Sequence, residues 1–182
     1  MMVSRRVFLS AAAAASTLEL DNAATPRCVV LDQGCVLPES STGYRVFASL
    51  HSGRGSVWGS GSVTEFVIVP GATRMPAAIQ PFLDRGATVL VELFANGGRI
   101  TPEPYFPYVE YSWPIEVKIR EFAAVALEPA PGDQVIGTLV RHPVALRRQV
   151  GRGTLVLLGS PLGPVFLSGD RDARRWLNAI LL

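Results

Sequence analysis

The chain has 182 residues, of which 48% are hydrophobic and 18% are charged. This length and composition fit one globular domain with a real core, and they exclude an intrinsically disordered chain. With 17 basic and 15 acidic residues the net charge is only +2, which excludes the strongly basic surface of a typical nucleic-acid-binding protein. No stretch has the roughly 20 apolar residues of a membrane span. We therefore expect no nucleic-acid partner and no stable membrane span.

The first 24 residues resemble an export signal. Two adjacent arginines, Arg5 and Arg6, precede an apolar run that ends in alanines, which is the pattern of a twin-arginine signal. We predict a signal segment over residues 1–24, a single domain over residues 25–182, and a periplasmic or extracellular location. The alternative is a basic N-terminal helix that stays attached, because alanine has a high helix propensity.

The sequence contains two cysteines, Cys28 and Cys35. In an oxidising compartment a disulfide between them would close a short loop, and the alternative is two unrelated thiols. Their spacing is not the C-x-x-C of a redox site, and two thiols alone do not make a zinc site. With two histidines and scattered acids in addition, we predict no metal site and no cofactor.

Apolar runs separated by turn residues predict alternating strands and helices. Two strands and the helix between them form a parallel crossover, with Pro81 expected to kink that helix, and the strands on either side of Gly151 form a hairpin. The predicted elements are strands at 28–32, 44–50 and 65–70, a glycine-rich loop at 51–61, a helix at 75–85, a strand at 87–94, strands within 115–127, strands at 135–140, 144–150 and 154–159, and a helix at 170–182. The predicted fold is a flavodoxin-like three-layer α/β sandwich. Its sheet is mainly parallel, with helices on both faces and an antiparallel C-terminal hairpin.

The segments at roughly 65–98 and 150–182 resemble the class I glutamine amidotransferase-like superfamily. They are most similar to its non-catalytic versions, such as the middle domain of some bacterial β-galactosidases. Active members carry a cysteine on the turn after the strand that corresponds to 88–94, and a His-Pro-Glu unit at the end of the final strand. Here that turn has no cysteine, and Ser160 stands where the histidine would be. The resemblance therefore implies a module without amidase activity.

Glu92 interrupts an otherwise apolar strand near its carboxyl end, where open α/β sheets bind ligands. A buried carboxylate is costly unless it is paired, and Arg74 and Arg99 follow neighbouring strand ends as candidate partners. Asn96 lies on the turn after the same strand. The alternative is that Glu92 forms a purely structural ion pair or reaches solvent at the edge of the sheet.

The segment 105–113 is rich in aromatic residues and prolines. Tyrosine and tryptophan suit stacking on sugar rings or sealing an interface, so Tyr111 and Trp113 are candidate ligand contacts. The segment is also a candidate homodimer surface. The alternative is a stiff loop that caps the core of the domain.

These observations predict an exported, non-catalytic module that binds a small polar ligand, such as a carbohydrate, or a protein partner at the carboxyl edge of the sheet. The alternative is a hydrolase with a rebuilt site, in which Glu92 or His51 is the general base and Ser160 is a further catalytic candidate. The predicted binding residues are Arg74, Glu92, Asn96, Arg99, Tyr111 and Trp113.

Overall fold

The computed structural model describes residues 27–32, 34–51, 65–94, 99–100, 108–121 and 124–181. The predicted signal segment at 1–24 and nearly all of the predicted loop at 51–61 lie outside the described residues. Within the described residues, no helix has both the length and the apolar character needed to span a membrane.

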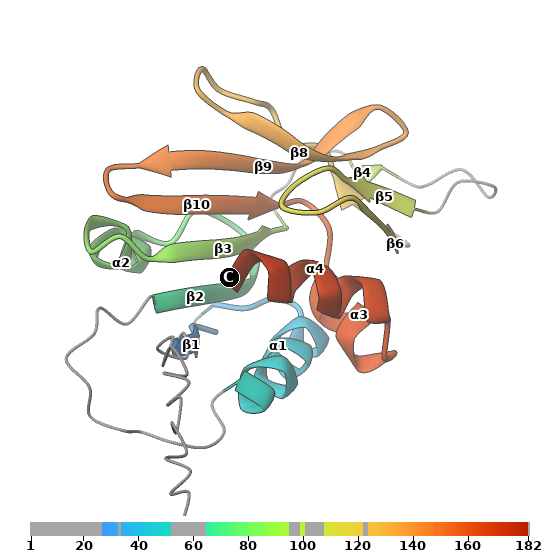
Figure 1. Ribbon diagram of the computed structural model, residues 1–182, viewed down its shortest axis with the longest axis horizontal. Coiled ribbons are helices and arrows are strands. Elements are labelled where there is room, and N and C mark those ends of the chain that lie inside the picture. The colour runs from blue at the N-terminus through green and yellow to red at the C-terminus, as the bar shows by residue number, and fades with distance from the viewer. Residues whose placement is uncertain are drawn as a thin grey trace, which may run out of the picture.

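A mixed eight-stranded sheet forms the centre of the molecule (Figure 1). Its strand order is β1-β2-β3-β10-β9-β8-β5-β6, and β4 pairs with β7 in a separate two-stranded sheet. The first four strands in this order are parallel, and every pairing from β10 onward is antiparallel. The strands are β1 (Arg27–Val30), β2 (Glu65–Ala72), β3 (Thr88–Leu93), β4 (Arg99–Ile100), β5 (Tyr108–Tyr111), β6 (Val117–Arg120), β7 (Ala124–Val125), β8 (Gln134–Leu139), β9 (His142–Val150) and β10 (Gly153–Leu158).

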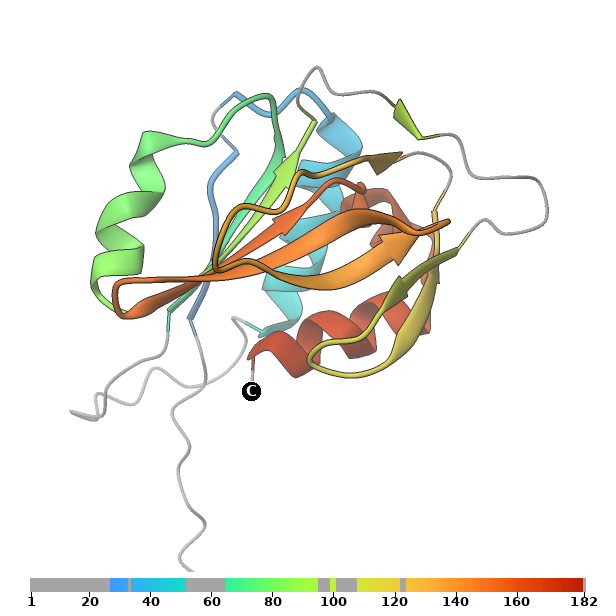
Figure 2. The ribbon, with the colours of Figure 1, turned by 90° about the horizontal axis from the view of Figure 1, so that it is seen from above.

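Two hydrophobic cores lie on opposite faces of the parallel half of the sheet. Along β2, Phe66 and Ile68 belong to one core, whereas Val67 and Val69 belong to the other, as expected because successive side chains of a strand point to opposite faces. The first core contains α1, α3 and α4, and the second contains η1 and α2, which Figure 2 shows on the other side of the strands. The helices are α1 (Pro38–His51), η1 (Ala77–Ile79), α2 (Gln80–Asp84), α3 (Leu162–Leu167) and α4 (Arg171–Leu181).

The antiparallel half of the sheet wraps towards α4 (Figure 2). The ring centroids of Tyr111 on β5 and Trp176 on α4 are 4.4 Å apart. Val109 and Ile119 are fully buried in the core that contains α4. This curvature brings the loop between β5 and β6 next to the exposed side of α4, where two surface pockets form.

The predicted flavodoxin-like, mainly parallel sandwich is wrong. Three of the pairings in the eight-stranded sheet are parallel and four are antiparallel, and the second face of the parallel half is covered by short η1 and α2. The described part of segment 105–113 is largely a strand rather than a stiff loop, since Tyr108–Tyr111 alternates between exposed and buried positions. That alternation is the signature of a half-buried strand.

The strand predicted at 44–50 is also wrong, because these residues belong to α1. The buried positions are Ser40, Gly43, Tyr44, Phe47 and Ala48, and spacings of three and four residues place them on one face of a helix. The prediction failed because its window began at Tyr44, after the first turn of the helix.

Several other predicted elements are confirmed. β2 and β3 form the parallel crossover, and β9 and β10 form the hairpin around Gly151. Pro81 does interrupt the predicted helix, which divides into η1 and α2 with Pro81 in the first turn of α2. Asp170 caps α4, since its Oδ1 accepts a hydrogen bond from the Ala173 N–H at 2.9 Å.

Candidate functional site

Glu92 lies near the carboxyl end of β3 and is fully buried. The backbone N–H of Gly71 donates a hydrogen bond to its Oε2 at 3.2 Å, and the N–H of Gly163 donates one to its Oε1 at 3.1 Å. Gly71 belongs to β2 and Gly163 to the first turn of α3. The carboxyl group therefore ties the end of β2 to the start of α3 across β3.

The backbone at Gly71 is shaped for this contact. Its φ is +53°, a left-handed conformation that glycine adopts without strain. The strand register between β2 and β3 shifts between Val69 and Ala72, and a Cβ at Gly71 would lie 3.1 Å from Cys35 Sγ. Glycine thus lets β2 bend and turn its N–H towards Glu92.

The hydroxyl groups of α1 face the same carboxyl. Burial raises the pKa of Glu92, while the hydroxyls of Tyr44 and Ser40 favour its charged form and oppose that rise. Neither hydroxyl makes a hydrogen bond of normal geometry with a described residue. The carboxyl is therefore surrounded by polar groups but buried away from bulk solvent, and burial favours its neutral form.

A second buried carboxyl lies in the same polar cluster. Glu121 is 1% exposed, and its Oε1 has no hydrogen-bond partner among the described residues. Burial raises its pKa well above the ordinary value, and the charges of Glu92 and Asp170 raise it further. Tyr111 and Ser160 complete the cluster, with 3.0 Å between their hydroxyl oxygens.

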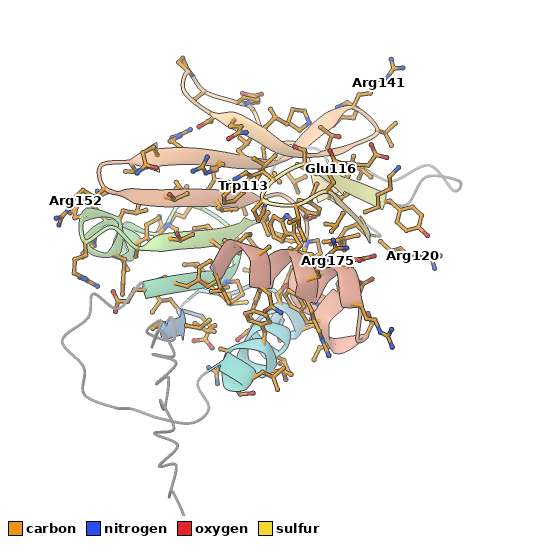
Figure 3. All side chains as sticks on the ribbon, in the orientation of Figure 1. Trp113, Glu116, Arg120, Arg141, Arg152 and Arg175 are labelled. Carbon is orange, nitrogen blue, oxygen red and sulfur yellow. The ribbon has the colours of Figure 1, made fainter. Side chains whose placement is uncertain are left out.

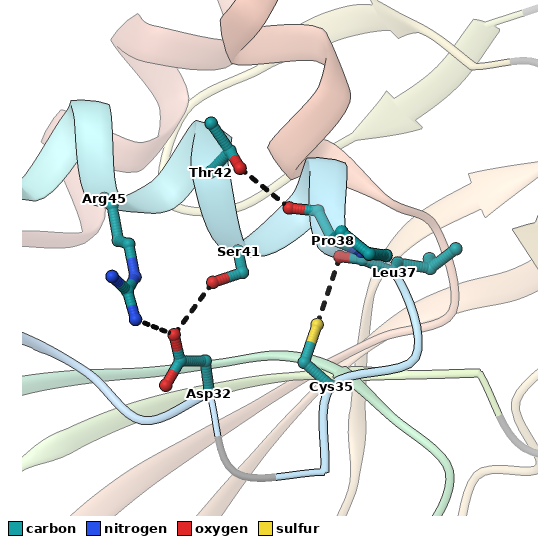
Figure 4. A network of polar contacts seen from close by, with 7 residues as sticks. All are labelled: Asp32, Cys35, Leu37, Pro38, Ser41, Thr42 and Arg45. Carbon is teal, nitrogen blue, oxygen red and sulfur yellow. Dashed lines mark hydrogen bonds and ion pairs between the residues drawn. The ribbon is translucent and has the colours of Figure 1, made fainter.

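The N-terminal part of α1 is anchored by a polar network beside β1 (Figure 4). Asp32 pairs with Arg45 and accepts a hydrogen bond from the Ser41 hydroxyl at 3.0 Å. The Arg45 and Ser41 hydrogen bonds lower the pKa of Asp32. This network fixes the helix that presents Ser40 and Tyr44 to the buried carboxyl.

The predicted disulfide between Cys28 and Cys35 is not formed, and both residues are free thiols. Cys28 lies on β1, where burial raises its pKa to about 11. The Cys35 thiol donates instead to the carbonyl oxygen of Leu37 at 3.1 Å (Figure 4). No group of three or more potential metal ligands occurs among the described residues.

The predicted ligand-binding set comes together only in part. Arg74 is exposed and forms no ion pair with Glu92, whose partners are backbone N–H groups. Asn96 and the side chains of Arg99 and His51 lie outside the described residues. Of the three catalytic candidates for a rebuilt hydrolase site, the structure describes the side chains of Glu92 and Ser160, and both are fully buried.

Trp113 holds the loop between β5 and β6 against the core. Its carbonyl oxygen accepts a hydrogen bond from Trp176 Nε1 at 2.7 Å. The Arg147 guanidinium carbon lies 4.6 Å from the centre of the Trp113 ring, a cation–π contact. This packing positions the residues that follow Trp113, which line the surface pockets.

The larger of two neighbouring surface pockets has a volume of about 670 Å³. It lies between β5, β6 and β8 and the first turn of α4, and Figure 3 labels two of its residues, Glu116 and Arg175. Acidic, basic and hydroxyl side chains all line it, so it offers both donors and acceptors. Its lining residues are Glu110, Tyr111, Ser112, Glu116, Val117, Lys118, Val135, Gly137, Thr138, Asp172 and Arg175. Of these residues, only Tyr111 was predicted from the sequence as a binding residue.

Replacing Glu121 with glutamine is expected to flatten the dependence of stability on pH. The pKa of Glu121 is raised in the folded protein. The contribution of this group to the free energy of unfolding is therefore fully present below its pKa in the unfolded chain, about 4.3, and is lost as the pH rises. Between its unfolded and folded pKa values, Glu121 is protonated only in the folded state. Over that pH range the free energy of unfolding of wild type decreases by about 1.4 kcal/mol per pH unit relative to the variant. Urea denaturation from pH 4 to pH 8 measures this difference, and the variant should be the more stable protein at pH 8.

Glu128→Gln is the control for this experiment, because it removes an exposed carboxylate. Its difference from wild type should vary little with pH. Parallel profiles for wild type and Glu121→Gln would show that Glu121 has an ordinary pKa.

No family model matches this chain, and no curated protein matches it either. Solved structures with a similar fold include the exo-β-1,4-mannosidase Op5Man5 from Opitutaceae bacterium strain TAV5, with 16% identity and a TM-score of 0.55 over 88% of this chain and 37% of that one. A β-galactosidase from Bacillus circulans sp. alkalophilus has 12% identity and a TM-score of 0.51 over 86% and 30% of the two chains. A β-galactosidase from Rahnella sp. R3 has 11% identity and a TM-score of 0.52 over 85% and 30%. The chain thus spans about a third of the length of these proteins and shares the fold of one part of them.

Proposed function

We propose that this chain is an exported, non-catalytic amidotransferase-like domain that binds a carbohydrate in the 670 Å³ pocket between the β5–β6 loop and α4. The pocket carries the proposal, because its carboxylates, cations and hydroxyls supply the paired donors and acceptors that sugar hydroxyl groups require. The similar structures are a mannosidase and β-galactosidases, which supports carbohydrate as the ligand class. Export remains part of the proposal, on the basis of the arginine pair near the N-terminus.

The buried cluster supports a non-catalytic domain over a hydrolase that uses Glu92 as its base. Glu92 is fully buried, lines neither pocket and is bonded to two backbone N–H groups. A general base must come within hydrogen-bond reach of the proton that it removes from a substrate. The Ser160 hydroxyl is likewise buried and bonded to Tyr111. Both groups serve the packing of the domain.

Glu116 has the acidic side chain best suited to a test of the pocket. It is exposed and makes no hydrogen bond or ion pair with another described residue, whereas Glu110 is paired with Lys118 at 2.5 Å. Glu116→Gln should weaken binding of a β-1,4-linked manno- or galacto-oligosaccharide by roughly 10-fold, because hydrogen bonds to charged groups contribute about 1.5–3 kcal/mol. NMR titration of the full chain measures the dissociation constants.

Glu128→Gln is again the matched control, since Glu128 is exposed and does not line the pocket. It should bind the sugars as wild type does. If neither oligosaccharide shifts the resonances of pocket residues at millimolar concentration, the chain does not bind these carbohydrates and the proposal is wrong.

A further inference from the structure

The exposed side of α4 carries a stripe of cationic and polar residues. Arg171, Arg174, Arg175 and Asn178 are exposed, and their spacing of three and four residues places them along one face of the helix. The opposite face of α4 provides the buried residues Ala173, Trp176, Leu177, Ile180 and Leu181. The stripe is therefore held rigidly by a helix that is packed into the core.

A second pocket, of about 490 Å³, lies along this stripe. Its charged lining residues are the three arginines, and Asn178 adds a further polar group. Ile115 and Ala179 provide apolar surface beside the guanidinium groups. This pocket thus combines positive charge with the apolar contact area that the carbon face of a sugar ring can cover.

The three arginines make no ion pair with any described residue. Arg174 donates a long hydrogen bond of 3.5 Å from Nη2 to the carbonyl oxygen of Phe166. Like charges three and four residues apart on a helix repel one another, so an anion that bound among the three arginines would relieve this repulsion. The planar fork of a guanidinium matches the oxygens of a carboxylate or a sulfate.

Arg175 belongs to both pockets. Glu116 and Asp172 line the first pocket and not the second, and Asp170, which precedes Arg171, caps α4 and lines neither pocket. The eight helical residues from Arg171 to Asn178 extend over about 10 Å, which is longer than one sugar ring. A chain of several sugars can therefore lie across both pockets, with its neutral hydroxyls in the mixed pocket and an anionic group among the arginines.

We infer that the ligand is an acidic oligosaccharide, whose carboxylate or sulfate ester occupies the pocket formed by Arg171, Arg174 and Arg175. This inference rests on the proposed carbohydrate-binding function and adds that the ligand carries negative charge. Carboxylate and sulfate share the chemistry that the arginines recognise, and the experiment distinguishes between them.

The test is calorimetric titration of the full chain with three probes of equal length. These are an oligogalacturonate, a sulfated galacto-oligosaccharide and a neutral galacto-oligosaccharide. At least one acidic probe should bind 10-fold or more tightly than the neutral one, and raising the salt concentration should weaken only the acidic probes. The double variant Arg171→Gln/Arg174→Gln should remove this preference, because the acidic probes lose affinity about 10-fold more than the neutral probe does.

Arg141→Gln is the single-charge control, because Arg141 is exposed at the β8–β9 turn, well away from Arg175 (Figure 3). It should keep the preference, and unchanged thermal unfolding of all variants would show that they are folded. Equal binding of acidic and neutral probes would overturn the inference and leave the proposed function standing. Absence of binding by all three sugars would overturn both. If a DNA oligonucleotide of equal charge binds as tightly as the acidic sugars, the stripe is a general polyanion site and the inference is again wrong.

Discussion

Replacing Glu92 with leucine is expected to lower the free energy of unfolding by about 2–4 kcal/mol. Leucine fills a similar volume but removes both acceptors, so the buried N–H groups of Gly71 and Gly163 lose their partners. Each unsatisfied buried donor costs about 1–3 kcal/mol, and removing the carboxyl from a dry site offsets part of this loss. Urea denaturation followed by circular dichroism measures the change.

Glu92→Gln separates the hydrogen bonds from the charge. Glutamine keeps one acceptor oxygen and the shape of the side chain, so we expect a smaller loss of about 1–2 kcal/mol. Because burial raises the pKa of Glu92 in the folded state, the wild-type contribution is greatest below about pH 4.3 and decreases as the pH rises. The deficit of the glutamine variant should therefore be largest in acid. A leucine variant as stable as wild type would mean that this carboxyl does not tie β2 to α3.

The elements that the sequence predicts well are those with an unambiguous burial pattern. β2 and β3 are buried on both faces, so an unbroken apolar run is enough to identify them. Apolar residues at 173, 176, 177, 180 and 181 predict α4, because this spacing places them on one face of a helix. β5 and its antiparallel pairing with β6 and β8 were missed, because the alternation in β5 is only four residues long. Its partner β8 follows later in the chain.

The candidate site was predicted only in part, because the sequence shows local patterns but not which distant segments meet in the fold. The sequence marks Glu92 because a charge within a buried strand is unusual. It cannot identify the partners of Glu92, since a backbone N–H has no signature in the sequence and the expected cation, Arg74, is exposed. The surface pockets were missed because the β5–β6 loop and α4 are far apart in the chain, and the curvature of the sheet brings them together. The polar spacing of Arg171, Arg174 and Arg175 was the available signal.

Replacing Gly43 or Gly163 with alanine is expected to destabilise the protein by about 3 kcal/mol or more, at the upper end of the range for overpacking. At these two glycines the backbones of α1 and α3 pack directly against each other. A Cβ on Gly43 would lie 1.8 Å from the carbonyl oxygen of Gly163, and a Cβ on Gly163 would lie 2.2 Å from the Cα of Ser40. Because backbone atoms are in the way, the helices must separate, and this cost exceeds the roughly 1 kcal/mol that alanine gains in helix propensity.

Thermal and urea denaturation measure these losses, with Thr42→Ala as the control on the exposed side of α1, where we expect a change within about 0.5 kcal/mol. The double variant Gly43→Ala/Gly163→Ala gives a sharper test, because either methyl group alone already forces the same separation. Its loss should be smaller than the sum of the two single losses, as expected for residues in contact. Separation of the helices also moves the Gly163 N–H away from Glu92. The loss of stability in the double variant Gly163→Ala/Glu92→Leu should therefore also be smaller than the sum of the two single losses. Additive losses would mean that the helix contact and the buried carboxyl stabilise the domain independently.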